Sequence, residues 1–372
     1  MKVGGVPYRA IFLDEDGWSV RAIDQTSLPH RFQLLRLESV EDMGRAIETM
    51  VVRGAPLIGA AAAYGVALAM RADPSDASLE HAIERLAATR LTAVNLQWAL
   101  HRLGEVVREL TPGERAEAAY RAAAALCDED VELNQAIGDH GLAVLRRLEE
   151  GVEGRTLNIL THCNAGWLAT VDWGTATAPM YKAYDNGLDL HVWVDETRPR
   201  LQGAALTAWE LGQHGISHTL IPDSAAAHLM SRSEVDVVIV GTDRTTASGD
   251  VTNKIGTYPL ALAAADNGVP FYVAAPSPSI DWQTEDATRI PIEQRDAAEV
   301  TSVRGLGLDD VVGDVRIAPE QTRAANYAFD VTPRHLVTGL ITERGVCSAS
   351  PDGLRRLFPE DAGTSPTTVN NR

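Results

Sequence analysis

Residues 157–166 read LNILTHCNAG, in which an apolar stretch, Leu157–Thr161, leads directly into polar residues. Four further apolar stretches follow, and segments with helical periodicity separate them. Continuous apolar strands that alternate with helices are typical of a parallel sheet covered on both faces. The sequence therefore predicts a doubly wound parallel sheet, with its other strands at Leu190–Val194, His218–Ile221, Val235–Val240 and Phe271–Ala274.

Helices are predicted between these strands and over most of the chain before them. Near the N-terminus, Ile11–Leu13 and Trp18–Ile23 flank the turn DEDG (14–17), which predicts a small β-hairpin. Pro56–Met70 is almost wholly apolar, so we expect this helix to be buried. The helices expected between the strands lie near Ala176–Asn186, Gln202–Gln213, Ser224–Met230 and Ile255–Asn267. Those expected before the sheet are Glu41–Val51, Pro56–Met70, Leu79–Ala88, Ala93–Leu110, Gly113–Asp128 and Val131–Leu148.

These patterns predict an α/β protein of two domains. A chain of 372 residues has room for two domains of ordinary size. We expect a mainly helical N-terminal domain with a small β-element over residues 1–128. The sheet domain is expected over residues 129–350, and a loosely ordered tail over residues 351–372.

The chain is acidic and poor in lysine. Its formal net charge is −18 at pH 7, and lysine occurs only at Lys2, Lys182 and Lys254. Nucleic acids and anionic membranes are bound by basic surfaces, so neither is an expected partner. An anionic substrate would have to be held by a few local cations or helix N-termini.

Reduced thiols in the cytoplasm are expected from the cysteine pattern. Cys127, Cys163 and Cys347 are odd in number and include no C-x-x-C spacing. The N-terminus has no apolar signal region, and no membrane span is predicted. His214 and His218 flank Gly215 at a predicted strand start, which does not favour a metal site. Dinucleotide and Walker A motifs are missing, so we expect neither metal nor cofactor.

Polar segments follow three of the predicted strands. They are THCNAG (161–166), DETRPR (195–200) and GTDR (241–244). In open α/β sheets, ligands bind beyond the carboxyl ends of the strands. The three segments are therefore predicted to converge on one crevice.

Arg53-Gly54-Ala55-Pro56 precedes the long apolar helix and is a candidate anion site. Free backbone N–H groups at a helix N-terminus attract anions, and Arg53 adds a full positive charge. The alternative is that Gly54 and Pro56 only start the helix and Arg53 is a surface charge.

Cys163 and Asp243 are the candidate reactive groups. Backbone N–H groups and nearby cations can shift a loop cysteine such as Cys163 toward thiolate, and the alternative is a buried small hydrophobe. Desolvation at a strand end would raise the pKa of Asp243 and suit it to general acid catalysis. The alternative for Asp243 is an aspartate that caps a helix or forms a salt bridge with Arg244. Candidate ligand contacts are Gln202, where capping is the alternative, and Asn253-Lys254, where a solvated helix start is the alternative.

Several long segments, in this order, closely resemble the methylthioribose-1-phosphate isomerases of methionine salvage. The wider family includes regulatory subunits of the translation-initiation guanine-nucleotide exchange factor and ribose-1,5-bisphosphate isomerases. The resemblance covers about residues 5–348. The segments are RGAPLIGAAAAYGVAL (53–68), TAVNLQWAL (92–100), THCNAGWLAT (161–170), DETRPRLQGAALTAWEL (195–211), GTDR (241–244), NKIGTYPLA (253–261) and DVTPRHLVTGLITERG (330–345).

The resemblance implies a Rossmann-like C-terminal domain, a homodimer and a sugar-phosphate substrate. It implies that Cys163 and Asp243 are the catalytic pair. The substrate contacts that it implies are Arg53, Gly54, Ala55, Arg90, Gln202, Asn253 and Lys254.

The implied reaction is an aldose–ketose isomerisation of 5-methylthioribose 1-phosphate. Because its anomeric carbon carries the phosphate, the ring must first open, and Asp243 is the expected acid. Cys163 would then move a proton between C2 and C1, or assist a hydride shift. The alternatives are an isomerase for another sugar 1-phosphate, such as 5-deoxyribose 1-phosphate or ribose 1,5-bisphosphate, and a non-enzymatic regulatory subunit that senses metabolites.

Overall fold

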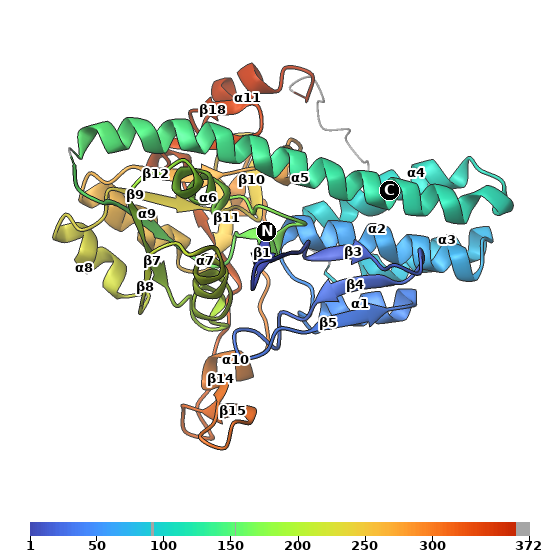
Figure 1. Cartoon of the computed structure of the whole chain (residues 1–372). Coiled ribbons are helices and arrows are strands. Elements are labelled where there is room, and N and C mark those ends of the chain that lie inside the picture. Colours follow the sequence, from blue (N-terminus) through green and yellow to red (C-terminus); the bar gives the residue numbers. More distant parts are fainter. Residues whose placement is uncertain (91–92, 153, 362–372) are drawn as a thin grey trace.

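A computed structural model describes residues 1–90, 93–152 and 154–361 of the chain. Its N-terminal part combines helices with a small antiparallel sheet, and its C-terminal part is built on a larger sheet (Figure 1). This order of elements confirms the predicted fold class.

The N-terminal β-element is a three-stranded antiparallel sheet in the order β3-β4-β5. The predicted hairpin is confirmed, with Phe12 opposite Arg21. Its turn is closed by Asp16, whose carboxylate accepts hydrogen bonds from the backbone N–H groups of Trp18 and Ser19. The strands of this region are β1 (Lys2–Val3), β2 (Val6–Pro7), β3 (Ile11–Leu13), β4 (Val20–Ile23) and β5 (Leu34–Leu37).

Helix α2 (Ala55–Ala72) is the buried centre of the N-terminal part, as predicted from its composition. Although α2 is long and apolar enough to cross a membrane, 78% of it is buried inside the protein. The helices packed around it cover its apolar surface, so α2 is a core helix. These helices are α1 (Val40–Glu48), α3 (Asp76–Ala87), α4 (Val94–Arg108) and α5 (Pro112–Gly151).

Helix α5 runs without a break over 40 residues. The prediction of two helices, Gly113–Asp128 and Val131–Leu148, was therefore wrong. The acidic residues between them, Glu129 and Asp130, interrupt the apolar pattern, but neither breaks a helix as glycine or proline would. At about 60 Å, α5 extends along both parts of the molecule (Figure 1). The domain boundary predicted at 128/129 lies within this helix, and the division into domains remains a prediction.

The central sheet has seven strands in the order β18-β17-β12-β9-β6-β7-β8, of which only β18 is antiparallel to its neighbour. All five predicted strands belong to it. The two strands at one edge, β17 and β18, were not predicted. The strands are β6 (Leu157–Thr161), β7 (Leu190–Asp195), β8 (His218–Ile221), β9 (Val237–Val240), β12 (Phe271–Ala274), β17 (Gly339–Thr342) and β18 (Gly345–Cys347).

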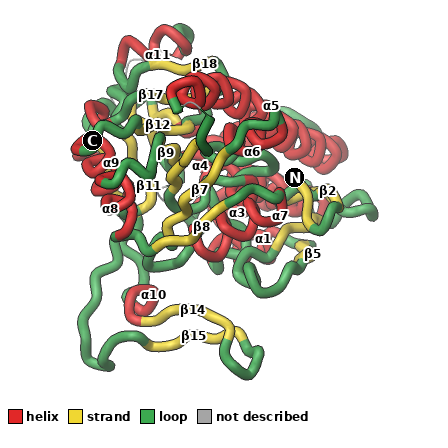
Figure 2. The backbone as a smooth tube through the Cα atoms, turned by 60° about the vertical axis from the view of Figure 1, so that its left-hand side comes forward, coloured by secondary structure: helices red, strands yellow, loops and turns green. Residues whose placement is uncertain are grey.

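The sheet carries a hydrophobic core on each face. Along β9, Val237 and Ile239 belong to one core, and Val238 and Val240 belong to the other. Helices α5, α6 and α7 lie on one side of the sheet and α8 and α9 on the other (Figure 2). The predicted doubly wound arrangement is therefore confirmed. The helices are α6 (Ala178–Asp185), α7 (Ala208–His214, preceded by a π-helical turn, Gly203–Thr207), α8 (Ala225–Ser231) and α9 (Thr257–Asp266).

A second sheet and a separate hairpin complete the C-terminal part. The second sheet has the order β13-β10-β11-β16. The hairpin β14–β15 follows the short helix α10 (Ala298–Thr301) and projects from the body of the molecule (Figure 2). The strands are β10 (Arg244–Thr246), β11 (Val251–Lys254), β13 (Ile280–Asp281), β14 (Ser302–Leu306), β15 (Val312–Arg316) and β16 (Phe329–Thr332).

The first residues of the predicted tail form helix α11 (Pro351–Leu357) instead of a loose segment. Ser350 caps this helix by accepting a hydrogen bond from the backbone N–H of Gly353. Leu354 and Phe358 are fully buried in the second core. These apolar contacts order residues that look like a tail in sequence, and residues 362–372 lie outside the described part.

Gly141 allows α5 to approach α6 closely, so we expect Gly141→Ala to destabilise the protein. A Cβ at this position would lie 2.2 Å from Cγ of Pro179. Overpacking of this kind costs about 1–3 kcal/mol. The free energy of unfolding in urea would measure the loss.

Gly113→Ala is the matched control, because it changes the same residue type in the same helix. A Cβ at Gly113 has no neighbour within 4 Å among the described residues. We expect this variant to be at least as stable as the wild type, since alanine favours helices over glycine. Equal stability of the two variants would contradict the close approach of α5 and α6.

Candidate functional site

The predicted catalytic pair lies in a shared cluster of charges at the carboxyl end of the central sheet. Arg53 and Lys254 both act electrostatically on Cys163 and on Asp243. Cys163 follows β6, Asp243 follows β9, and Lys254 ends β11. Arg53 precedes α2, so it comes from the N-terminal part of the chain. The structure therefore brings these four predicted residues together.

Arg53 is held against the loop that carries the thiol. Its Nη1 donates a hydrogen bond of 2.5 Å to Oδ1 of Asn164, and its Nη2 donates one of 3.0 Å to the backbone oxygen of Asn164. Asn164 is 3% exposed and directly follows Cys163. These two bonds fix a guanidinium beside the thiol, which contradicts the alternative of a surface charge.

Asn164 is in turn oriented by Glu210 of α7. Nδ2 of Asn164 donates to Oε1 of Glu210 at 2.8 Å, and the backbone N–H of Leu168 donates to Oε2 at 3.2 Å. Glu210 is fully buried. Burial raises the pKa of Glu210 to about 8, although these hydrogen bonds and Arg53 act in the opposite direction. The position of Arg53 thus depends on a glutamate that the sequence reading did not single out.

Gly54 has a backbone conformation that an L-side chain would strain. Its φ is 100°, and a Cβ there would lie 2.5 Å from backbone atoms of Ala169. Helix α2 begins at Ala55 without a side-chain cap, with Pro56 in its first turn. The N–H groups of that turn therefore remain for an anion at the positive end of the helix dipole, next to Arg53.

Two other predicted ligand contacts, Arg90 and Asn253, differ in how they relate to this cluster. Arg90 acts electrostatically on Asp243 and pairs with Glu293 at 3.3 Å. Asn253 is buried and donates to the hydroxyl of Thr257 at 3.0 Å. Its amide is therefore partly used inside the protein. Arg90 therefore lies beside the charge cluster, whereas the side chain of Asn253 contacts Thr257.

Burial dominates the electrostatics of the two reactive groups. It raises the pKa of the Asp243 carboxyl, with Arg53, Arg90 and Lys254 opposing it. This direction agrees with the expected general acid. Burial also raises the pKa of the Cys163 thiol, although Arg53 and Lys254 lower it. The expected shift of Cys163 toward thiolate is therefore wrong for the free protein, because desolvation outweighs the two cations.

A cavity of about 700 Å³ lies next to this cluster. Arg53 and Gln202 line it, whereas Cys163, Asp243 and Lys254 are not among its lining residues. Within the described residues, the buried Oε1 of Gln202 has no hydrogen-bond partner. Gln202 can therefore accept a hydrogen bond from a ligand that enters from the cavity.

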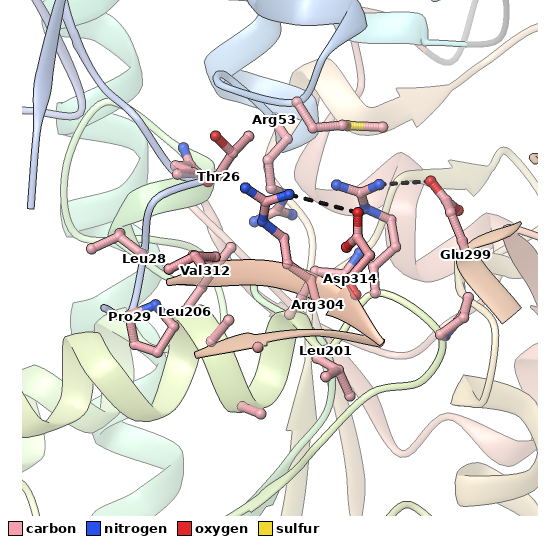
Figure 3. Close-up of a pocket in the computed structure, with 18 of the residues that line it drawn as sticks. Thr26, Leu28, Pro29, Arg53, Leu201, Leu206, Glu299, Arg304, Val312 and Asp314 are labelled. Carbon is pink, nitrogen blue, oxygen red and sulfur yellow. Dashed lines mark hydrogen bonds and ion pairs between the residues drawn. The ribbon is translucent and has the colours of Figure 1, made fainter. Parts of the chain in front are cut away.

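The far wall of the cavity comes from α10 and the β14–β15 hairpin, which the sequence reading missed. Figure 3 shows Arg304 and Asp314 of the hairpin facing Arg53, with Glu299 paired to a neighbouring arginine. That arginine is Arg200, and its Nη1 lies 2.6 Å from Oε1 of Glu299. The turn residues Gly307, Asp309 and Asp310 between two short segments with apolar residues are a signal for a hairpin, but local sequence does not say where a hairpin packs.

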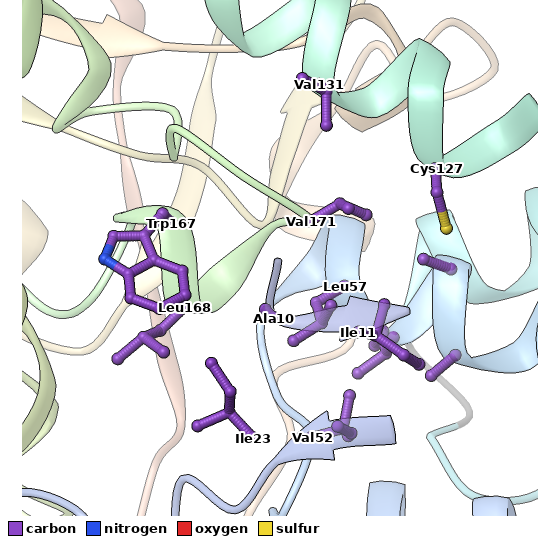
Figure 4. Packing of buried hydrophobic residues seen from close by; sticks show 14 of the residues in the cluster. Ala10, Ile11, Ile23, Val52, Leu57, Cys127, Val131, Trp167, Leu168 and Val171 are labelled. Carbon is purple, nitrogen blue, oxygen red and sulfur yellow. The ribbon is translucent and has the colours of Figure 1, made fainter. Parts of the chain in front are cut away.

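Apolar packing anchors the thiol loop on the N-terminal core. Trp167 and Leu168 follow the loop and share a core cluster with Ile23 and Leu57 (Figure 4). The side chain of Gln25 adds a hydrogen bond of 2.6 Å to the backbone oxygen of Leu168. The site is therefore built across both parts of the chain.

His162, Asp195 and Asp223 bring possible metal ligand atoms within 4.8 Å of one another. Both oxygens of Asp223 accept backbone N–H groups, from Thr197 and Arg198. Asp195 contacts the ring of His162 and the hydroxyl of Thr197. This arrangement is a hydrogen-bonded network that holds the loop over residues 195–200.

The chain matches the model of the initiation factor 2 subunit family over residues 51–349. It is 61% identical to a methylthioribose-1-phosphate isomerase of Acidiphilium cryptum, with 97% of this chain and 99% of that protein covered. A similar protein from Rhodospirillum rubrum is 60% identical, with 97% and 94% covered.

Two solved structures are similar in fold and sequence. The 5-methylthioribose 1-phosphate isomerase of Pyrococcus horikoshii gives a TM-score of 0.81 at 41% identity, with 95% of this chain and 96% of that chain covered. The delta subunit of translation initiation factor eIF-2B from A. fulgidus gives 0.79 at 39% identity, with 95% and 100% covered. An isomerase and a subunit of a translation initiation factor thus share this fold.

Glu210→Gln is expected to change how stability depends on pH. The pKa of Glu210 is raised to about 8 in the folded protein, so folding favours its protonated form. This contribution is complete below the ordinary glutamate pKa and is lost as the pH rises through about 8. The wild type should therefore lose up to about 1.4 kcal/mol per pH unit relative to the variant over this range.

Urea unfolding between pH 5 and pH 9 would measure this difference. Glu132→Gln, on the exposed side of α5, is the control and should follow the wild type. Parallel curves for the wild type and Glu210→Gln would contradict a protonated Glu210.

Proposed function

Because the chain belongs to the initiation factor 2 subunit family, we propose that it is the member that converts 5-methylthioribose 1-phosphate to 5-methylthioribulose 1-phosphate in methionine salvage. One observation carries this choice: a thiol, an acid of raised pKa and two cations share one cluster, in which Cys163 and Lys254 are buried and Arg53 and Asp243 are partly buried. The identity of 61% over 97% of the chain to an isomerase supports it. A regulatory subunit that only senses metabolites would need no such acid and thiol.

Arg53, Lys254 and the first turn of α2 are the groups that hold the phosphate. Arg53 is fixed by Asn164, and Lys254 is only 5% exposed. Burial lowers the pKa of Lys254, while Cys163 and Asp243 raise it. A bound phosphate would restore full protonation of this lysine and offset the cost of its burial.

Asp243 is the general acid that opens the sugar ring. Its carboxyl can remain protonated because burial raises its pKa. Transfer of this proton to the ring oxygen lets the bond between C1 and that oxygen break. The positive charge that develops at C1 acidifies the hydrogen on C2, and the enclosed site protects C1 from attack by water.

Cys163 completes the hydrogen transfer from C2 to C1. It can act as a base, for which its proton must first leave, or assist a hydride shift as a neutral thiol. Its raised pKa means that the free enzyme keeps the thiol protonated. The two routes differ in whether hydrogen exchanges with solvent.

The proposal includes a homodimer in the cytoplasm. Cys127, Cys163 and Cys347 are free and buried, which is consistent with a reducing compartment. Light scattering of the purified protein would measure its mass, and a monomer at micromolar concentration would contradict the dimer.

Cys163→Ala and Asp243→Asn should each lower kcat by about 10²- to 10⁴-fold, since each removes a group that acts on the reacting atoms by either route. NMR of the sugar products would follow turnover, and circular dichroism would check the fold. Cys347→Ala, which removes a buried thiol from the edge strand β18, is the matched control and should keep the wild-type rate. A near-normal rate in either site variant would contradict its role.

Turnover in deuterated water should distinguish the two routes for hydrogen. Deuterium at C1 of the product supports proton transfer through Cys163. Its absence supports a hydride shift or a shielded base that returns the same proton. Substrates that differ only at C5, assayed side by side, would test the preference for the methylthio group, and a clear preference for a second phosphate would contradict it.

A further inference from the structure

His162 is a fully buried histidine to which the mechanism above gives no role. It directly precedes Cys163, and only 1% of its surface is exposed. Buried ionisable groups without a partner are costly, so its contacts need an explanation. Those contacts reach two other loops of the site.

Both ring nitrogens of His162 face oxygen atoms. Nδ1 lies 2.6 Å from Oδ2 of Asp195, and Nε2 lies 2.9 Å from the backbone oxygen of Ile255. A backbone carbonyl can only accept, so Nε2 must carry a hydrogen. The contact of Nδ1 with a carboxylate needs a second hydrogen. With Oδ1 of Asp195 accepting from Thr197, this geometry fits an imidazolium paired with the Asp195 carboxylate.

The electrostatic surroundings agree with this geometry. Burial disfavours the charged ring, but Asp195 and Asp223 outweigh burial and raise the pKa of His162. Asp330 also interacts with the ring electrostatically, and Lys254 is the nearby cation on the segment that His162 contacts. Three carboxyl groups near the ring thus favour its positive charge, and one lysine disfavours it.

Hydrogen bonds through the hydroxyl of Thr197 link Asp195 to the backbone of Cys163. Oγ1 of Thr197 donates to Oδ1 of Asp195 at 2.6 Å and accepts from the backbone N–H of Cys163 at 2.8 Å. Thr197 is fully buried and Asp195 is 2% exposed. Because the hydroxyl has one hydrogen, the direction of both bonds is fixed. Cys163 itself has a φ of 65°, a strained conformation for a residue other than glycine, which its surroundings must hold.

The second contact of His162 reaches the lysine. Ile255, whose oxygen accepts from Nε2, directly follows Lys254. The ring therefore joins the thiol loop to the end of the strand that carries the phosphate-binding cation. We propose that His162 is a positioning residue, an imidazolium that fixes Cys163 relative to Lys254 through Asp195, Thr197 and Ile255. This role rests on the proposed function.

His162→Gln should lower kcat by about 10- to 100-fold, because small displacements of reacting groups cost this much. A glutamine amide cannot carry the charge or make both contacts. The matched control is His214→Gln, which removes a histidine paired with Asp185 at 2.9 Å on α7 and α6. We expect the control to keep the wild-type kcat. A wild-type kcat in folded His162→Gln would overturn the proposal.

Thr197 offers a test that leaves the histidine in place. Thr197→Val loses both hydrogen bonds and should lower kcat about 10-fold, whereas Thr197→Ser keeps the hydroxyl and should restore it. The double variant with His162→Gln should be no slower than the slower single variant, since both act through one chain of contacts. Rates that multiply, or a Thr197→Val enzyme with full activity, would overturn the network.

Two measurements do not depend on turnover and so separate this proposal from the proposed function. In wild-type protein with ¹⁵N-labelled histidine, NMR should show two N–H signals for His162 that persist from pH 6 to pH 9 and vanish in His162→Gln. A single ring N–H at pH 8 would overturn the imidazolium. Alkylation of Cys163 by iodoacetamide, with Cys127 and Cys347 replaced by alanine, should change in rate in Thr197→Val but not in Thr197→Ser. An unchanged rate in Thr197→Val would contradict positioning of the thiol, even if the wild type does not isomerise methylthioribose 1-phosphate.

Discussion

The two hydrogen bonds from Arg53 to Asn164 connect the parts of this molecule at its reactive centre. Arg53 directly precedes Gly54 and the buried helix α2 of the N-terminal part, and Asn164 follows the thiol at the end of a sheet strand. Glu210 supports this contact from the other side of Asn164. If the contact between Arg53 and Asn164 were lost, the thiol would no longer share one site with the guanidinium and the positive end of α2. The anion site and the reactive thiol are therefore positioned by the same contact.

Burial near the contact between Arg53 and Asn164 shifts the pKa values of acidic groups and of lysine in opposite directions. It raises the pKa values of Asp243, Glu210 and Cys163, and it lowers that of Lys254. The protonated carboxyl of Asp243 can donate a proton to open a sugar ring. The buried ammonium of Lys254 is stabilised when an anion binds beside it. The overall charge of −18 gives a substrate phosphate no general attraction, so the few enclosed cations must supply it.

Asn164, which follows Cys163, is bonded to Arg53, and His162, which precedes Cys163, belongs to a second hydrogen-bonded network. Asn164 fixes the loop toward α2, and Thr197 fixes the backbone of Cys163 toward β7. Ile255 extends the same network to the strand of Lys254. Each neighbour of the thiol is thus held by a different element, which explains how a residue with a φ of 65° is maintained.

The sequence by itself determined the doubly wound sheet, the buried helix α2 and the residues of the charge cluster, because apolar periodicity and strand-end motifs are local signals. Two predictions from the sequence were wrong. The two helices predicted on either side of Asp130 are one helix, and the predicted tail around Leu354 is a packed helix. Only the tertiary structure decided the protonation of Cys163, the roles of Glu210 and His162, and the hairpin wall beside Arg53. Each of these depends on desolvation or on contacts between residues far apart in the chain, which no local pattern records.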